Sequence, residues 1–257
     1  MSQSLAYIHP NAKIGENVTI SAFSYIYEDV EIGDGTWIGP NVTIMDGARI
    51  GKNCKIFPGA VISAIPQDLK FAGEYTTTEI GDNTIIRECV TINRGTTDKL
   101  KTVVGNNCLL MGYVHIAHDC IVGNNCIFVN YAALSGHCVV GDYAILEGMA
   151  AAPQFVQIGA HAFIAGSTII RKNVPPFVKA AREPISYMGI NAIGLRRRGF
   201  SEEKVNTIQD IYRVLFQKGV NISQALEIIM REFPKSDERE EILNFVIKSD
   251  KGIINRG

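Results

Sequence analysis

The chain has 257 residues, of which 46% are hydrophobic, and its 25 basic and 26 acidic side chains give a formal net charge of −1. This length allows one or two domains, and a nearly neutral chain gives no reason to expect nucleic acid or a membrane surface as a partner. The first residues contain no basic segment followed by an apolar run, and no apolar stretch approaches the ~20 residues of a membrane span. We therefore expect no signal peptide, no membrane span and a cytoplasmic location.

A six-residue repeat dominates the chain from residue 8 to about residue 175. Isoleucine recurs at every sixth position over residues 8–62, and large apolar residues keep the same phase over 80–92 and 104–170. Neither a helical period of 3.6 nor a strand period of 2 produces this step. Four positions after each anchor stands a small or β-branched residue, and five cysteines at such positions are interpreted as small core residues: Cys54, Cys108, Cys120, Cys126 and Cys138.

Six residues suit one flat side of a triangular prism, so three sides would give 18 residues per coil, with neighbouring coils about 4.8 Å apart as adjacent strands. The repeat therefore predicts a mainly β protein that coils as a parallel β-helix. Glycine often follows the anchor, as at Gly33, Gly51 and Gly105, which we interpret as the need of the chain to bend. The spacing does not determine the handedness of the coil.

The repeat is interrupted near residues 64–79 and 94–103, where loops are expected to leave the coil. Such loops frequently carry function. The first contains Gln67-Asp68-Leu69-Lys70, which places opposite charges and an amide together. A solvated loop tip is the alternative interpretation.

The hexapeptide domain is predicted to cover residues 1–184, and a linker with a small helical domain residues 185–257. Ser201, followed by two glutamates, is typical of a helix start, and the apolar spacing predicts a helix that ends before Gly219. Two more helices are predicted over 223–233 and 236–248. Together they would cap the open end of the coil.

The 18-residue coil brings distant polar residues together. It places five of them on one edge of three consecutive coils: His118, Asp119, Gly136, His137 and Gln154. His115 lies three residues away on the same coil. His9 and His161 fall elsewhere and are interpreted as surface histidines.

A neutral imidazole beside a carboxylate and an unobstructed glycine N–H forms a plausible acyl-transfer site. His118 would be the general base, Asp119 would orient it, and the Gly136 N–H would meet an oxyanion. Surface histidines on a structural coil are the first alternative. A zinc site formed by His115, His118 and His137 is the second, although His115 and His118 fall on different phases of the coil.

Four motifs are more specific than the hexapeptide. They are Gln67-Asp-Leu-Lys-Phe-Ala-Gly-Glu74, Arg87-Glu-Cys-Val-Thr-Ile-Asn-Arg-Gly95, His115-Ile-Ala-His-Asp-Cys120 and Gly194-Leu-Arg-Arg-Arg-Gly-Phe200. With them the chain resembles, over almost its whole length, the acyl-carrier-protein-dependent UDP-N-acetylglucosamine O-acyltransferases, which catalyse the first step of lipid A biosynthesis. The resemblance implies a homotrimer of left-handed β-helices with active sites in the clefts between neighbours.

The resemblance also implies roles for single residues. His118 would take the proton of the glucosamine 3-hydroxyl, which attacks the thioester of a (3R)-3-hydroxyacyl chain on acyl carrier protein without a covalent acyl-enzyme. Asp119 would pair with His118, and Gly136 would donate to the oxyanion. No cofactor is implied beyond the phosphopantetheine that the carrier protein brings, and no metal.

The positions that hold the nucleotide sugar in this family match Asp68, Lys70, His115, His137, Gln154, Asn191 and Arg198. Gln67 in the same loop is counted with this substrate-binding set. Arg197 matches a position near the phosphopantetheine, and Gly166 matches the end of the acyl channel, where a small residue implies a longer chain. A basic set would attract an acidic carrier protein: Arg171, Lys172, Lys179, Arg182 and Arg196. The chain departs from the family at Pro153 and Ile193, both near the sugar end.

Three rival functions differ in features that can be checked. The sister N-acyltransferase would carry an extra N-terminal uridine-binding domain, whereas the coil here begins at Ile8. A hexapeptide zinc hydratase would hold one zinc ion per subunit. An ice-binding solenoid would need a flat array of outward threonines, which the sequence lacks.

Overall fold

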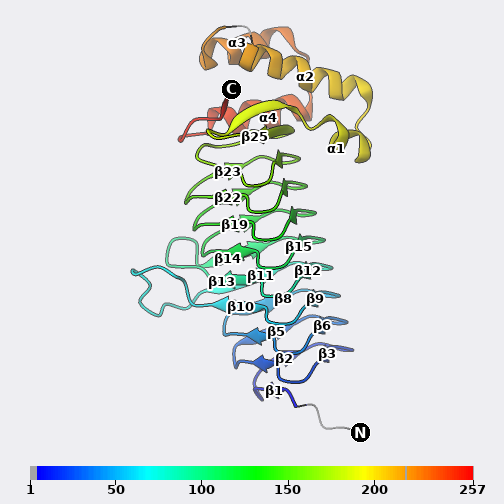
Figure 1. The fold of residues 1–257 in the computed structure, drawn as a ribbon, viewed down its shortest axis with the longest axis vertical. Coiled ribbons are helices and arrows are strands. Elements are labelled where there is room, and N and C mark those ends of the chain that lie inside the picture. The colour runs from blue at the N-terminus through cyan, green and yellow to red at the C-terminus, as the bar shows by residue number, and fades with distance from the viewer. Residues whose placement is uncertain (1–4, 218, 257) are drawn as a thin grey trace.

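The computed structural model describes residues 5–217 and 219–256, and over that range the chain forms a left-handed parallel β-helix with helices at one end (Figure 1). This is the predicted fold class. Residues 1–4, which belong to the segment searched for a signal peptide, lie outside the described part, as does residue 218. No helix in the described ranges is long and apolar enough to cross a membrane.

Three sheets form the sides of the prism. The first contains β1 (Tyr7–Ile8), β4 (Tyr25–Ile26), β7 (Thr43–Ile44), β10 (Val61–Ala64), β13 (Thr91–Asn93), β16 (His115–Ile116), β19 (Ala133–Leu134) and β22 (Ala151–Ala152). The second contains β2 (Lys13–Ile14), β5 (Val30–Ile32), β8 (Ala48–Ile50), β11 (Thr77–Ile80), β14 (Lys101–Val104), β17 (Ile121–Val122), β20 (Val139–Val140) and β23 (Gln157–Ile158). The third contains β3 (Thr19–Ile20), β6 (Trp37–Ile38), β9 (Lys55–Ile56), β12 (Ile85–Ile86), β15 (Leu109–Leu110), β18 (Ile127–Phe128), β21 (Ile145–Leu146), β24 (Phe163–Ile164), β25 (Val178–Ala181), β26 (Ser186–Ile190) and β27 (Asn255–Arg256).

The strand register confirms the predicted coil of 18 residues. His115 pairs with Ala133, for example, and the pairing is parallel. Ile50 pairs with Ile80 and Ile80 with Val104, so the coil lengthens to 30 and then 24 residues at the two predicted loops. The extra residues leave the prism there, and Figure 1 shows the chain after β10 projecting from its side.

The interior is filled by the anchors and the small residues between them. From Ile26 onward the anchors of the coil are buried, and each contributes roughly 2 kcal/mol by leaving water. The five cysteines assigned to the core are buried and unpaired, whereas Cys89 is half-buried. Their interpretation as small core residues is therefore confirmed.

The glycines that follow the anchors do not make the bends, contrary to the prediction. A Cβ on Gly33 would lie 2.6 Å from the carbonyl carbon of Gly51, and one on Gly105 would lie 2.6 Å from that of Gly123. These glycines therefore allow successive coils to approach each other. The left-handed bends themselves fall on other residues, such as Asn107 with φ 55°.

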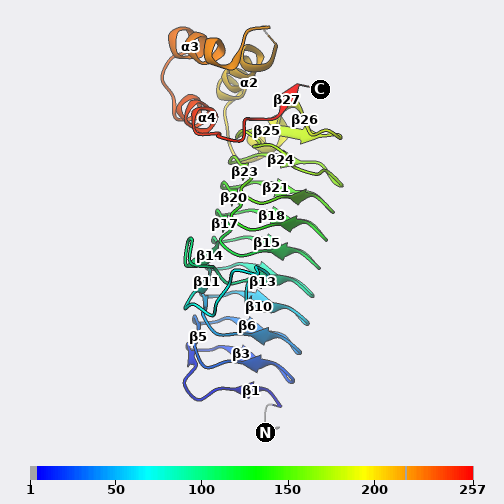
Figure 2. The ribbon, with the colours of Figure 1, turned by 90° about the vertical axis from the view of Figure 1, so that its left-hand side faces the viewer.

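The helical region covers the last coils. Its helices are α1 (Ala192–Arg197), α2 (Glu202–Gln217), α3 (Ile222–Glu232) and α4 (Asp237–Ile247), and Figure 2 shows α2, α3 and α4 stacked beyond β24. The last three lie within two residues of their predicted positions. Strands β25 and β26 form an antiparallel pair across the predicted boundary at residue 184, and α1 follows it; the sequence indicated neither. The domain boundary itself stays a prediction.

Candidate active site

The five residues predicted to share an edge of the coil do so. They follow β16, β19 and β22 at the same corner of three consecutive coils: His118, Asp119, Gly136, His137 and Gln154. The His137 N–H donates to the His118 carbonyl at 3.0 Å, and the Phe155 N–H donates to the Gly136 carbonyl at 3.1 Å. Backbone hydrogen bonds between coils therefore fix the spacing of the edge.

His118 and Asp119 form a buried pair. Nδ1 of His118 lies 2.8 Å from Oδ2 of Asp119, and the residues are 3% and 0% exposed. Burial works against ionisation of the Asp119 carboxyl, but hydrogen bonds from Thr96, His118 and Lys99 outweigh it and lower its pKa. An ionised carboxylate can only accept, so His118 donates through Nδ1 and keeps the lone pair of Nε2 for chemistry.

The second loop supplies partners of Asp119 that the sequence analysis missed. The hydroxyl and the N–H of Thr96 and the N–H of Lys99 all donate to the carboxylate. The Asp119 N–H in turn donates to Oγ1 of Thr102 at 2.9 Å. The break in the repeat at 94–103 was the available signal, but a loop without periodicity does not show which of its residues face inward.

Gly136 lies directly against the His118 ring. A Cβ at this position would lie 2.5 Å from Cε1 and 2.7 Å from Nε2 of His118, so only glycine leaves room for the imidazole. Within the described ranges, no acceptor takes the Gly136 N–H. The edge therefore offers a basic nitrogen close to a free backbone donor.

His137 continues the edge on the next coil. Its Nδ1 lies 3.0 Å from Oδ2 of Asp98 in the second loop. Its ring stacks on Phe155, with centroids 4.5 Å apart, and meets His118 edge to face at 5.0 Å. The second loop thus contacts both the His118–Asp119 pair and the neighbouring imidazole.

The possible metal ligands differ from the zinc set considered from the sequence. Ligand atoms of His118, Asp119 and His137 lie within 4.8 Å of one another. His115 does not belong to this cluster; its Nδ1 shares a hydrogen bond of 2.7 Å with Oγ1 of Thr91. Burial and the nearby His118 lower the pKa of His115. Since the Asp119 carboxylate already accepts four hydrogen bonds, a cation would have to displace protein donors.

Three predicted substrate-binding residues lie in the first loop. Oδ1 of Asp68 accepts the Lys70 N–H at 2.9 Å, and Gln67 is exposed. In the part of the chain that the structure describes, no hydrogen bond or ion pair joins these residues to the His118 edge. The loop is tied to the second loop instead, because Oε1 of Glu74 accepts the Thr97 N–H at 3.2 Å.

Other predicted residues gather around α1. Asn191 caps this helix by accepting the Gly194 N–H, and it lines a pocket of about 230 Å³ together with Arg197. Gly166 is exposed just after β24, and a Cβ added to it would lie 3.2 Å from the Gly148 carbonyl oxygen. The structure thus brings Asn191 and Arg197 together, and in the described ranges no hydrogen bond or ion pair joins either of them to the His118–Asp119 pair.

His161 is not the ordinary surface histidine that the sequence indicated. Its ring stacks between Tyr143 and Phe177, and Nη1 of Arg198 lies 3.4 Å from its Nδ1. Burial, reinforced by the charge of Arg198, lowers the pKa of His161 to about 4. Arg198, predicted to hold the sugar, also donates to the Tyr143 carbonyl at 3.0 Å, and burial lowers its pKa.

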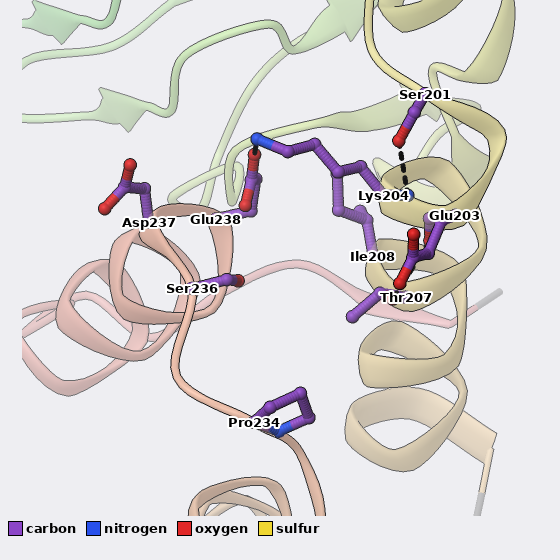
Figure 3. Close-up of a pocket in the computed structure, with 9 residues that line it drawn as sticks. All are labelled: Ser201, Glu203, Lys204, Thr207, Ile208, Pro234, Ser236, Asp237 and Glu238. Atoms are coloured by element: carbon purple, nitrogen blue, oxygen red, sulfur yellow. Dashed lines mark hydrogen bonds and ion pairs between the residues drawn. The ribbon is translucent and has the colours of Figure 1, made fainter.

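A separate pocket of about 400 Å³ lies between the first turns of α2 and α4 (Figure 3). Nζ of Lys204 reaches across it to Oε1 of Glu238 at 2.6 Å. Glu203 and Asp237 stand in the first turns of the two helices, where negative charge offsets the helix dipole. The acidic residues thus stabilise the helix ends, and the Lys204–Glu238 ion pair joins α2 to α4.

Both parts of the chain match known families. A model described as UDP N-acetylglucosamine O-acyltransferase, domain 2, matches residues 173–254, and the bacterial transferase hexapeptide model matches 29–64 and 101–136. The acyl-[acyl-carrier-protein]–UDP-N-acetylglucosamine O-acyltransferase of Chlorobium phaeobacteroides is 61% identical over 241 residues, which cover 93% of this chain and 91% of that protein. The chain belongs to this acyltransferase family.

More distant members support the same assignment. The O-acyltransferase of Thiobacillus denitrificans is 41% identical over 250 residues, 97% of each chain. The structure of a UDP-N-acetylglucosamine acyltransferase from Bacteroides fragilis matches with a TM-score of 0.97 and 52% identity, over 99% of this chain and 100% of that one. The corresponding structure from Acinetobacter baumannii gives 0.95 and 37%, over 98% and 99%. Membership of this family and its enzyme class, predicted from the four motifs, are confirmed.

Proposed function

We propose that the protein transfers a (3R)-3-hydroxyacyl chain from acyl carrier protein to the 3-hydroxyl of UDP-N-acetylglucosamine, the first step of lipid A biosynthesis, with His118 as general base. Family membership supports the reaction class. The observation that carries the mechanism is the geometry at His118: Nδ1 is bound by Asp119 at 2.8 Å, while the Nε2 side of the ring lies against Gly136.

The reaction proceeds by direct attack on the thioester. Nε2 of His118 takes the proton of the 3-hydroxyl as that oxygen attacks the thioester carbonyl. The Gly136 N–H donates to the oxyanion, and Asp119 stabilises the imidazolium without taking its proton. Collapse of the intermediate breaks the carbon–sulfur bond, and the imidazolium returns the proton to the departing phosphopantetheine thiolate. An ester and the free carrier thiol result, with no acyl-enzyme.

The remaining predicted residues bind the two substrates. The nucleotide sugar is held by Gln67, Asp68, Lys70, His115, His137, Gln154, Asn191 and Arg198. Arg197 lies near the phosphopantetheine, and Gly166 limits the acyl channel, where the lack of a side chain accommodates a longer chain. The first loop projects from its own coil, which supports a homotrimer in which it reaches a neighbour's edge.

His118→Ala tests the mechanism, with UDP-N-acetylglucosamine and a mixture of hydroxyacyl carrier proteins as substrates and mass spectrometry of the product. Turnover should fall by at least ~100-fold, the usual contribution of a general base. The protein should still fold, but the free energy of unfolding should fall by about 1–3 kcal/mol, because the change removes a hydrogen bond from the buried Asp119 carboxylate. His9→Ala, at the far end of the coil, is the matched control. A His118→Ala enzyme with a tenth of wild-type turnover contradicts the assignment. An alkali-stable amide product would favour the sister N-acyltransferase. One bound zinc ion per subunit would favour the hexapeptide zinc hydratase.

A further inference from the structure

The second loop closes over the carboxylate of Asp119, and the mechanism above gives this loop no role. Thr96, which is 7% exposed, donates its N–H to Oδ1 at 3.0 Å and its hydroxyl to Oδ2 at 2.6 Å. The Lys99 N–H donates to Oδ1 at 3.2 Å, and His118 occupies the remaining position at Oδ2. A carboxylate has about four acceptor positions, so all of them are filled.

We propose that Thr96 is a positioning residue of the acyl transfer: its hydroxyl, acting through Oδ2 of Asp119, holds the carboxylate in the orientation that aligns His118 for proton transfer. This inference rests on the proposed function. It concerns a loop residue whose side chain contacts Asp119 and not the reacting nitrogen.

The hydroxyl matters more than the backbone donors because it shares an oxygen with the imidazole. Both Thr96 Oγ1 and His118 Nδ1 donate to Oδ2, whereas the two N–H groups donate to Oδ1. Rotation of the carboxylate about its Cβ–Cγ bond would break the hydroxyl contact and the imidazole contact together. Without the hydroxyl, Oδ2 is held only by the imidazole that it is meant to hold.

The loop itself is fixed in place, so the hydroxyl is presented by a rigid support. The Leu100 N–H donates to the Thr96 carbonyl at 2.8 Å, and Nζ of Lys99 donates to the Asp119 carbonyl at 3.1 Å. The Asp119 N–H is held by Thr102. A group positioned to within about half an ångström in this way is what proton transfer requires.

Loss of the hydroxyl also changes the balance of charge at the pair. A hydroxyl hydrogen directed at Oδ2 stabilises the negative carboxylate most when His118 is neutral, because the imidazolium otherwise neutralises that charge. Without it, the pair retains its proton to higher pH. A substitution of Thr96 replaces none of the other ionisable residues near the His118–Asp119 pair, which are His115, His137, Glu74, Asp98 and Lys99.

The experiment compares Thr96→Val with Thr96→Ser, and uses Thr97→Val as the matched control. Thr97 is exposed, and only its N–H, which valine keeps, is hydrogen-bonded. We expect Thr96→Val to lower kcat by ~10-fold or more, with KM for the nucleotide sugar unchanged and the acid limb of the pH–kcat profile raised by about half a pH unit. Thr96→Ser should restore both, and Thr97→Val should match the wild type.

An NMR titration of the His118 imidazole in wild type and Thr96→Val supplies a readout independent of catalysis. The midpoint should rise in the variant. If the wild type fails to acylate the sugar, the proposed function is wrong. The titration would still show whether the Thr96 hydroxyl acts on His118 through Asp119. An unchanged midpoint and acid limb, or a serine variant as impaired as the valine variant, would overturn the inference. Thr96→Ala, which adds no bulk, takes the place of valine if that variant does not fold.

Discussion

Replacing Gly136 by alanine tests whether the space at this corner positions the catalytic imidazole. The added Cβ would lie 2.5 Å from Cε1, 2.7 Å from Nε2 and 3.1 Å from Nδ1 of His118, whereas ordinary contact begins at 3.4 Å. The ring must therefore move by about 1 Å. Since Nδ1 is only 2.8 Å from Oδ2 of Asp119, a shift of that size stretches or breaks the hydrogen bond.

A misplacement of about 1 Å costs about 100-fold in rate, which corresponds to about 2.7 kcal/mol in the activation barrier. The backbone of Gly136 does not adopt the left-handed conformation, so alanine introduces no backbone strain. We therefore expect kcat to fall by about 100-fold. The strained buried hydrogen bond should lower the free energy of unfolding by about 1–3 kcal/mol, so the variant should still fold.

The assay is steady-state acyl transfer with a hydroxyacyl carrier protein and UDP-N-acetylglucosamine, beside thermal unfolding of the same samples. Gly112→Ala is the matched control, because this glycine stands at an equivalent corner where the nearest atom to an added Cβ is the movable Nδ2 of Asn130, at 3.1 Å. That variant should keep wild-type kcat. A Gly136→Ala enzyme that retains more than half of the wild-type kcat would show that the ring position does not depend on this space.

Two further predictions concern stability. Tyr212→Phe removes the buried hydroxyl that donates to the Pro176 carbonyl at 2.6 Å. The free energy of unfolding, measured by denaturant titration, should therefore fall by about 1–3 kcal/mol. Tyr131→Phe, at an exposed position, should leave it unchanged. The pKa of His161 is about 4 in the folded protein and near 6.5 in the unfolded chain, so between these values the unfolded chain binds more protons and the fold loses stability as the pH falls. His161→Gln should flatten the dependence of Tm on pH between 6.5 and 4, and parallel curves for the two proteins would contradict the role given to this imidazole.

The sequence predicted the coil and the edge because both depend on a single number. Once a coil consumes 18 residues, the neighbour of any residue is found by addition, and this placed His118 against Gly136 without knowledge of a side-chain conformation. The same addition places His161 above Tyr143. The spacing could not predict that Phe200 and Arg198 contact His161, because those two residues lie after the end of the repeat.

The 18-residue spacing does not predict the positions of residues in the loops. The interruption at 94–103 was visible, yet nothing in its composition distinguishes Thr96, which is buried against Asp119, from Thr97, which is exposed. Their difference arises from the turn in which the Leu100 N–H binds the Thr96 carbonyl. The β25–β26 pair and α1 were missed for a similar reason, since their residues follow neither the six-residue step nor a helical period long enough to recognise.

The bends of the coil fix the backbone of the residues on this edge. Each bend requires a residue in the left-handed conformation, which costs a non-glycine residue roughly 1–2 kcal/mol and is best tolerated by asparagine. Asparagine occupies many of these bends: Asn17, Asn41, Asn53, Asn83, Asn107 and Asn125. On the His118 edge the bends carry Asp119, His137 and Phe155, of which aspartate and histidine tolerate the left-handed conformation and phenylalanine is a poorer choice for the backbone. A side chain at a bend points away from the filled interior and has its backbone fixed by the coils on either side. On this edge Asp119 occupies a bend and His118 directly precedes it, so the coil fixes the backbone of both residues of the proposed catalytic pair.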